Sequence, residues 1–153
     1  MNIFNPNLCL AKQLKNSWST NIVTELDPEK IPIEVIQGVP RLKMIHDTNS
    51  GEDWFACALP LNNSWGKVDI SKFTTLEFSL YTNEENTGVV RLEDEDNAES
   101  KDVEIDPIPG EETQISIKLN SFKSSGLDYK KIRLLKIIGH KGSSFYVSEL
   151  RLE

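Results

Sequence analysis

The residues of this 153-residue chain that could take part in catalysis are two histidines and a number of carboxylates. A nucleophilic triad would need His46 or His140 beside a nucleophile and an acid, and no spacing in the sequence indicates one. We expect both histidines to be surface loop residues. The nucleophile elbow, the P-loop and the dinucleotide-binding glycine motif are all absent. The carboxylates fall in turns and on exposed strand faces, where nothing tunes one of them as an acid. We therefore predict that the chain is not an enzyme.

Metal ligation and cysteine chemistry have little support. The run Glu93–Asn97 offers hard oxygen ligands but lacks the glycine and distant glutamate of a calcium loop, so we expect an acidic hairpin turn and no metal. Two cysteines and two histidines are too few for a zinc framework. Cys9 and Cys57 either pair in an oxidising compartment or remain half-buried thiols.

Charge is negative overall and unevenly distributed. The net charge of −7 argues against general binding to nucleic acid or to acidic membranes. Residues 77–112 carry 13 acidic and 2 basic side chains, a local charge of −11. A basic group follows them in the sequence: Lys118, Lys123, Lys130, Lys131, Arg133, Lys136 and Lys141. Such blocks are usually solvated surfaces, and the alternative is that one of them meets an oppositely charged partner.

The compartment stays open. The first residues lack the basic and apolar regions of a signal peptide, and no apolar run approaches the ~20 residues of a membrane helix. A cytoplasmic protein would look like this, and so would an extracellular module excised from a secreted enzyme.

Period-two alternation dominates the chain and predicts the elements that position these side chains. Residues 74–81 place Leu76, Phe78 and Leu80 on one face and Glu77, Ser79 and Tyr81 on the other. Further strands are predicted at 41–46, 54–59, 89–93, 102–106, 113–119, 132–138 and 145–152. Short helical turns are expected at 69–73 and 127–131, and a turn at 27–32. Strands separated by turn signals indicate an all-β sandwich of two antiparallel sheets. We expect one domain over residues 1–153, with the weakest strand signals in residues 1–38.

Five segments, in order, resemble carbohydrate-binding modules with the galactose-binding-like jelly-roll fold. One is Val68–Tyr81, which is similar to the family pattern D-[IL]-S-x-[FY]-x-x-L-x-F-x-[LV]-[YW]. The others are 90–94, 114–122, 127–132 and 145–152, and the resemblance covers about residues 40–153. It implies a jelly-roll β-sandwich that binds a polysaccharide, of β-glucan type for instance, without cutting it. It also implies attachment to a glycoside hydrolase. Many members carry a structural calcium beside an Asp pair of the closing strand, where this chain has Ser148 and Glu149.

Sugars present apolar C–H faces and a rim of hydroxyls, so a site needs aromatic planes and fixed polar groups. The family's common ligand face is a concave sheet surface. We expect Tyr81, Arg91 and Glu93 to form a patch on such a face, with Trp65 and Trp54 as further stacking platforms. Trp18, in the weakly patterned first segment, is a candidate without an assigned position. The competing hypotheses are a protein-interaction sandwich and a purely structural one, neither with a glycan ligand.

Overall fold

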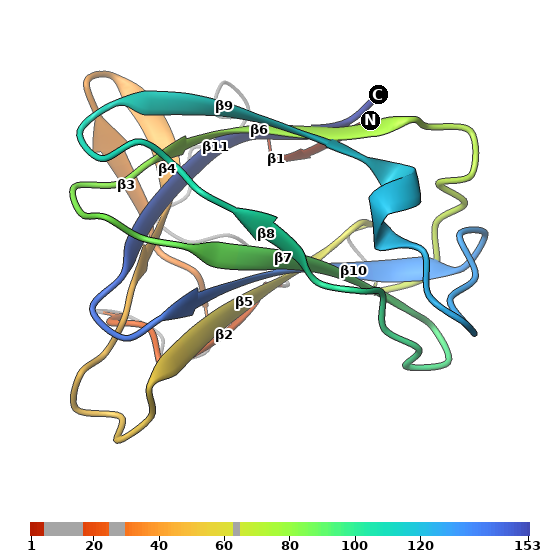
Figure 1. Cartoon of the computed structure of the whole chain (residues 1–153), viewed down its shortest axis with the longest axis horizontal. Coiled ribbons are helices and arrows are strands. Elements are labelled where there is room, and N and C mark those ends of the chain that lie inside the picture. Colours follow the sequence, from red (N-terminus) through yellow and green to blue (C-terminus); the bar gives the residue numbers. More distant parts are fainter. Residues whose placement is uncertain (5–16, 25–29, 63–64) are drawn as a thin grey trace.

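The chain folds into two antiparallel β-sheets that pack face to face, as shown by a computed structural model (Figure 1). The structure describes residues 1–4, 17–24, 30–62 and 65–153. Within these residues, one sheet has six strands in the order β3-β4-β11-β6-β9, with β1 also paired to β11, and we call it sheet I. The other has five strands in the order β2-β5-β10-β7-β8, and we call it sheet II. Figure 1 shows sheet I as the upper layer and sheet II as the lower layer. The jelly-roll β-sandwich predicted from the sequence is confirmed.

The strand positions follow the predicted alternation closely. The strands of sheet I are β1 (Asn2–Phe4), β3 (Ile33–Ile36), β4 (Val39–Ile45), β6 (Thr75–Tyr81), β9 (Glu112–Lys118) and β11 (Ser144–Leu152). Those of sheet II are β2 (Trp18–Thr20), β5 (Trp54–Pro60), β7 (Gly88–Asp94), β8 (Val103–Ile105) and β10 (Ile132–His140). The consecutive strands β6 and β7 lie in different sheets. β6 lies between β11 and β9 in sheet I, and β7 lies between β10 and β8 in sheet II.

The apolar residues of each alternating strand form the core between the sheets. Leu76, Phe78 and Leu80 of β6 are at most 1% exposed, as predicted. Phe55, Phe78, Phe122 and Phe145 are its largest buried side chains. In β11 the alternation breaks at Ser148 and Glu149, where the register shifts and Glu149 has a φ of 55°. Such an irregularity lets Leu150 and Leu152 face the core again after Val147.

Three local predictions need correction. Residues 69–73 and 127–131 form turns and not helical turns, because Asp69 and Asp128 side chains accept backbone N–H groups two residues on. The helical segment of the described residues is instead a short 3-10 turn, η1 (Leu119–Phe122), which buries Leu119 and Phe122. His46 was expected on the surface, yet it is 4% exposed, because it directly follows β4 and packs against Phe55.

Of the two cysteines, the structure describes Cys57. Cys57 is fully buried in β5, and its thiol donates to Met44 Sδ at 2.9 Å. Burial raises the pKa of this thiol to about 12, so Cys57 is protonated and inert at neutral pH. Cys9 lies outside the described residues. The same holds for residues 27–29, the first three of the turn predicted at 27–32.

The two chain ends lie side by side. β1 pairs with the end of β11, and Leu152 N donates to Met1 O at 2.8 Å. Figure 1 shows the N and C labels next to each other on the sheet I side. No helix among the described residues is long and apolar enough to span a membrane.

Candidate functional site

The outer face of sheet II carries two exposed tryptophans over a floor of small residues. Inward-facing Phe55, Cys57 and Leu59 belong to the core, so Trp54, Ala56 and Ala58 point outward. Trp18 on β2 lies opposite Ala58 of β5. The next residue along β2, Ser19, is buried. Trp18 is 41% exposed and Trp54 is 42% exposed. Ala58 lies four positions beyond Trp54 along β5, which places the two tryptophans about 13 Å apart along the strand direction.

Trp65 follows the other end of β5. It is 39% exposed and sits in a turn with a φ of 59°. Asn62 caps this turn, since its Oδ1 accepts the Gly66 N–H at 2.9 Å. Trp54, Trp18 and Trp65 therefore follow one another along β5: one at its start, one opposite its middle and one beyond its end.

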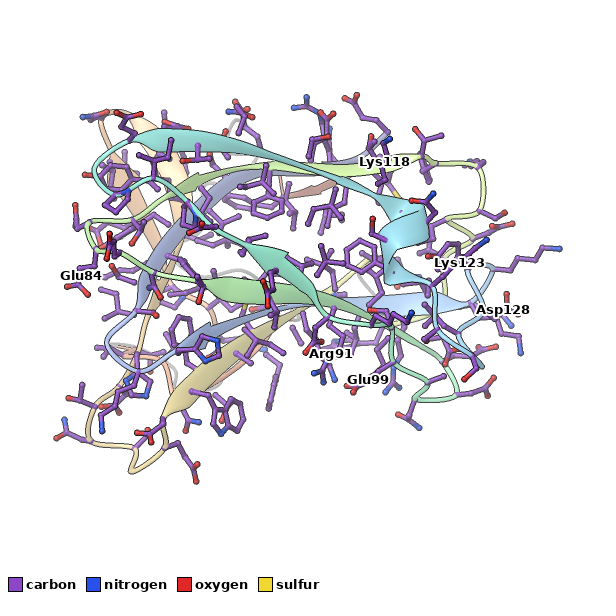
Figure 2. All side chains as sticks on the ribbon, in the orientation of Figure 1. Glu84, Arg91, Glu99, Lys118, Lys123 and Asp128 are labelled. Atoms are coloured by element: carbon purple, nitrogen blue, oxygen red, sulfur yellow. The ribbon has the colours of Figure 1, made fainter. Side chains whose placement is uncertain are left out.

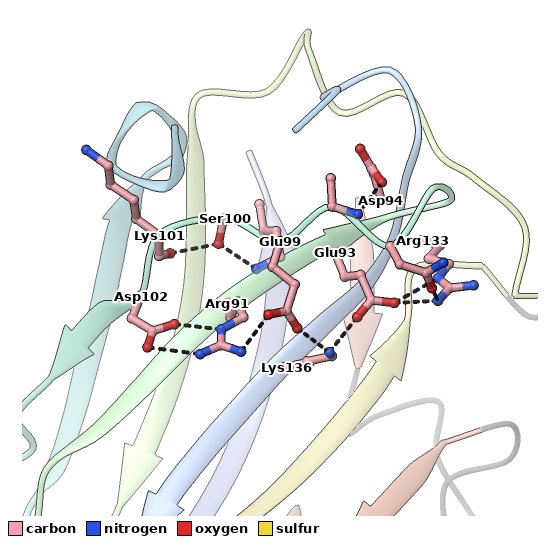
Figure 3. A network of polar contacts seen from close by, with 12 residues as sticks. Arg91, Glu93, Asp94, Glu99, Ser100, Lys101, Asp102, Arg133 and Lys136 are labelled. Carbon is pink, nitrogen blue, oxygen red and sulfur yellow. Dashed lines mark hydrogen bonds and ion pairs between the residues drawn. The ribbon is translucent and has the colours of Figure 1, made fainter. Parts of the chain in front are cut away.

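An alternating chain of charges occupies the other half of the same face (Figure 3). We call it the charged ladder, and in order it comprises Asp102, Arg91, Glu99, Lys136, Glu93 and Arg133. Arg91 makes a two-point contact with Asp102, through Nε–Oδ1 at 2.6 Å and Nη2–Oδ2 at 3.1 Å. Its Nη1 donates to Glu99 Oε2 at 2.8 Å. Figure 2 shows Arg91 and Glu99 on the outer side of sheet II. The ladder fixes these side chains in place.

The ladder also shifts the protonation of its members. Burial alone would raise the pKa of Glu93, but hydrogen bonds from Lys136 and Arg133 outweigh it and lower that pKa. The hydrogen bond from Arg91 lowers the pKa of Asp102, and the same contact raises the pKa of Arg91. All three side chains are consequently charged at neutral pH.

The acidic and basic blocks of the sequence meet each other in the fold. Lys131, Arg133 and Lys136 of the basic group pair with acids between Glu93 and Glu99. These charges are thus neutralised within the molecule to a large extent. The protein nevertheless keeps a net charge of −7, so an oppositely charged partner stays an open alternative.

The predicted patch of Tyr81, Arg91 and Glu93 does not exist as one surface. Arg91 and Glu93 face outward from sheet II, whereas Tyr81 faces outward from sheet I on the opposite side of the molecule. Tyr81 lies beside Tyr146 of β11, with ring centroids 6.2 Å apart, and its hydroxyl donates to Asn83 Oδ1 at 2.8 Å. The expectation failed because β6 and β7, although consecutive in the sequence, belong to different sheets.

The structure therefore brings Trp54, Arg91 and Glu93 to one face, leaves Trp65 at its end, and places Tyr81 elsewhere. Glu93 is 6% exposed, because Arg133 and Lys136 cover it, so Trp54 and Arg91 are the members of this set that reach solvent. Trp18 completes the face and was not assigned from the sequence. A three-residue strand is too short to show a period, so its exposed position was not visible there. The segment around Trp18 packs against the core, because its residues Ser17, Ser19 and Ile22 are buried.

The acidic run forms the predicted turn. Asp94 is 1% exposed, and its carboxylate accepts backbone N–H groups from Asp96, Ala98 and Asp128. Glu95 and Asp96 contact Lys131. At the closing strand, Ser148 is buried. Across the described ranges, no three His, Cys, Asp or Glu side chains are grouped to hold a metal ion.

The fold is similar to that of several solved carbohydrate-binding modules. A family 30 module has 16% sequence identity and a TM-score of 0.69, with 100% of this chain and 97% of that chain covered. A family 11 module from Clostridium thermocellum, in complex with a β-1,3-1,4-mixed-linked tetrasaccharide, has 12% identity and a TM-score of 0.63 over 97% and 92%. An exo-β-agarase has 15% identity and a TM-score of 0.73 over 99% of this chain and 24% of its own. No protein-family model and no curated protein sequence matches the chain. At these identities the likeness shows the fold.

Proposed function

We propose that the chain is a non-catalytic carbohydrate-binding module that binds a polysaccharide on the outer face of sheet II. The observation that carries this proposal is the exposure of all three tryptophans, at 41%, 42% and 39%. Tryptophan is highly buried on average, so three exposed indoles along one strand need a function to explain them. An indole plane stacks well on the apolar C–H face of a sugar ring.

The spacing of the tryptophans favours an extended chain as the ligand. Trp54 and Trp18 are separated along the strand direction, and Trp65 lies farther on, so successive sugars of one polymer can reach successive indoles. The small floor of Ala56 and Ala58 leaves room between them. The ladder adds polar groups beside this row, with Lys136 opposite Ala58 and Arg91 opposite Lys136. Aromatic planes and fixed polar groups are the two components a sugar site requires.

A neutral glucan of β-glucan type is the proposed ligand class, supported by the mixed-linkage oligosaccharide bound to the family 11 neighbour. We expect modest affinity, with Kd on the order of micromolar to millimolar, as is usual for wet and shallow sites. The agarase neighbour, in which the similar region is 24% of a longer chain, supports attachment to a catalytic domain. Such a tether raises the concentration of the enzyme on its polymer.

Native affinity electrophoresis tests the proposal. Gels contain β-glucan, xyloglucan, mannan or pectin, and the samples are the wild type, W18A/W54A and Y81A. Each indole exposes about 100 Å², and a sugar covering half of it contributes roughly 1–1.5 kcal/mol, about tenfold in affinity. We expect retardation by one polymer class, its loss in W18A/W54A, and its retention in Y81A, whose side chain lies on sheet I. Absence of retardation in every gel, for a folded wild type, would overturn the proposal.

A further inference from the structure

His46 contacts the chain on both sides of Trp54 without touching the ligand face. Its Nε2 lies 2.9 Å from the carbonyl oxygen of Glu52, two residues before Trp54. Its ring packs against Phe55, the residue after Trp54, with centroids 6.0 Å apart and an interplanar angle of 35°. The side chain is 4% exposed, so these contacts are made inside the sandwich.

The backbone around His46 is tied to the same strand start. His46 N donates to Ser143 O at 3.1 Å, and His46 also forms an isolated bridge with Ile22. The next residue, Asp47, donates from its N–H to Asn21 O at 2.7 Å. Asn21 Nδ2 in turn donates to Trp54 O at 3.0 Å. Asn21 therefore links Asp47, near the start of the loop between β4 and β5, to Trp54 at the start of β5.

The chemistry of imidazole suits this position. A carbonyl oxygen only accepts, so the hydrogen bond to Glu52 requires the proton on Nε2. Nδ1 is buried and has no hydrogen-bond partner within the described part of the chain, where Nε2 makes the polar contact of the ring. Phenylalanine would supply the ring without the donor, and glutamine the donor without the ring. Histidine supplies both in one side chain.

We propose that His46 is a positioning residue that holds Trp54 in the orientation used for glycan binding. This inference rests on the proposed function of the sheet II face. Without the His46–Glu52 bond, residues 47–53 are held less firmly and Trp54 spends less time in the binding orientation. The apparent affinity falls in proportion to the fraction of molecules in that orientation.

The experiment compares His46→Phe, His46→Gln and a control, Leu76→Val, in the full chain. Leu76 is fully buried on β6 in sheet I, where it lies opposite Leu152 and Ile117, so its shortening lowers stability at a site on other strands than those that flank Trp54. Affinity for a soluble mixed-linkage β-glucan is measured by calorimetry. The orientation of Trp54 is followed through its indole N–H signal in ¹H–¹⁵N NMR spectra without ligand.

We expect H46F to bind about three- to tenfold more weakly, the range of one buried hydrogen bond. Its Trp54 indole signal shifts while that of Trp65 stays in place. H46Q recovers part of the affinity, and L76V changes neither readout. The proposal is overturned if H46F matches the wild type in affinity and spectrum, or if L76V produces the same loss. A separate variant, W54A, tests the glycan face itself: wild-type affinity in W54A would refute the proposed function, whatever the His46 variants do.

Discussion

Among side chains of similar size, Asp94 is the one whose replacement we expect to lower the free energy of unfolding most. Its carboxylate accepts three backbone N–H groups: Asp96 and Ala98 on Oδ1, both at 2.9 Å, and Asp128 on Oδ2 at 3.1 Å. The first two close the turn after β7, and the third joins that turn to the segment leading into β10. One side chain thus holds together two loops that are 34 residues apart in the sequence.

The magnitude follows from the number of bonds lost. A hydrogen bond to a charged group contributes roughly 1.5–3 kcal/mol, and some of the freed N–H groups in these turns regain water. We expect Asp94→Ala to lower the free energy of unfolding by about 3 kcal/mol, which corresponds to a Tm decrease of roughly 6–12 °C for a chain of this size. Asp94→Asn keeps one acceptor oxygen and presents an N–H₂ to Asp128 N, so we expect a loss of about 1–2 kcal/mol.

The pH dependence gives a second measurement of the same residue. Burial would raise the pKa of Asp94, but backbone hydrogen bonds from Asp128, Ala98 and Asp96 lower it below its usual 3.8. A lowered pKa in the folded state adds stability above the unfolded pKa, and that stability is lost as pH falls through the folded pKa. The gap between wild type and D94A should therefore narrow on acidification below about pH 4. Urea unfolding of wild type, D94N and D94A at several pH values checks both expectations. A D94A variant within about 0.5 kcal/mol of wild type at pH 7 would refute the reasoning.

Two further predictions concern packing and charge. Replacing Gly139 on β10 with alanine puts a Cβ 2.2 Å from Phe55 Cζ. We expect the free energy of unfolding to fall by about 1–3 kcal/mol or more, measured by thermal unfolding. An unchanged Tm would contradict the close approach of the Phe55 ring to Gly139. Because the cations of the charged ladder are already paired, we expect glucan affinity to change less than about twofold between roughly 50 and 500 mM NaCl. A steep fall with salt would instead favour a charge-driven partner.

The sequence revealed the strands more readily than their arrangement. The alternation at β6 and β9 correctly placed Leu76, Phe78, Leu80 and Ile117 inside, because a half-buried strand requires that pattern. The pattern carries no information on which strands pair. Tyr81 and Arg91 were consequently assigned to one patch, although their strands lie in opposite sheets.

The candidate site was predictable only in part. Trp54 shares its outward face with Ala56 and Ala58, and small neighbours alone did not show whether that face was core or surface. In the folded chain Trp54 is 42% exposed, and the pairing of β5 with β2 adds Trp18 to its face. His46 was misplaced for a related reason: a polar residue at the end of a strand looks like a loop residue until Phe55 covers it.

The edges of the two sheets bear on the proposed binding of this protein to a polysaccharide. Many copies on one polysaccharide are brought to high local concentration, where exposed strand edges of neighbouring molecules can join into a continuous sheet. Among the described residues, β2, β3 and β8 are edge strands of three, four and three residues, too short to template such growth. The longer edge, β9, presents Glu112, Gln114, Ser116 and Lys118 to solvent. An added strand would take water away from these polar and charged side chains, which disfavours the joining of β9 to a neighbouring sheet.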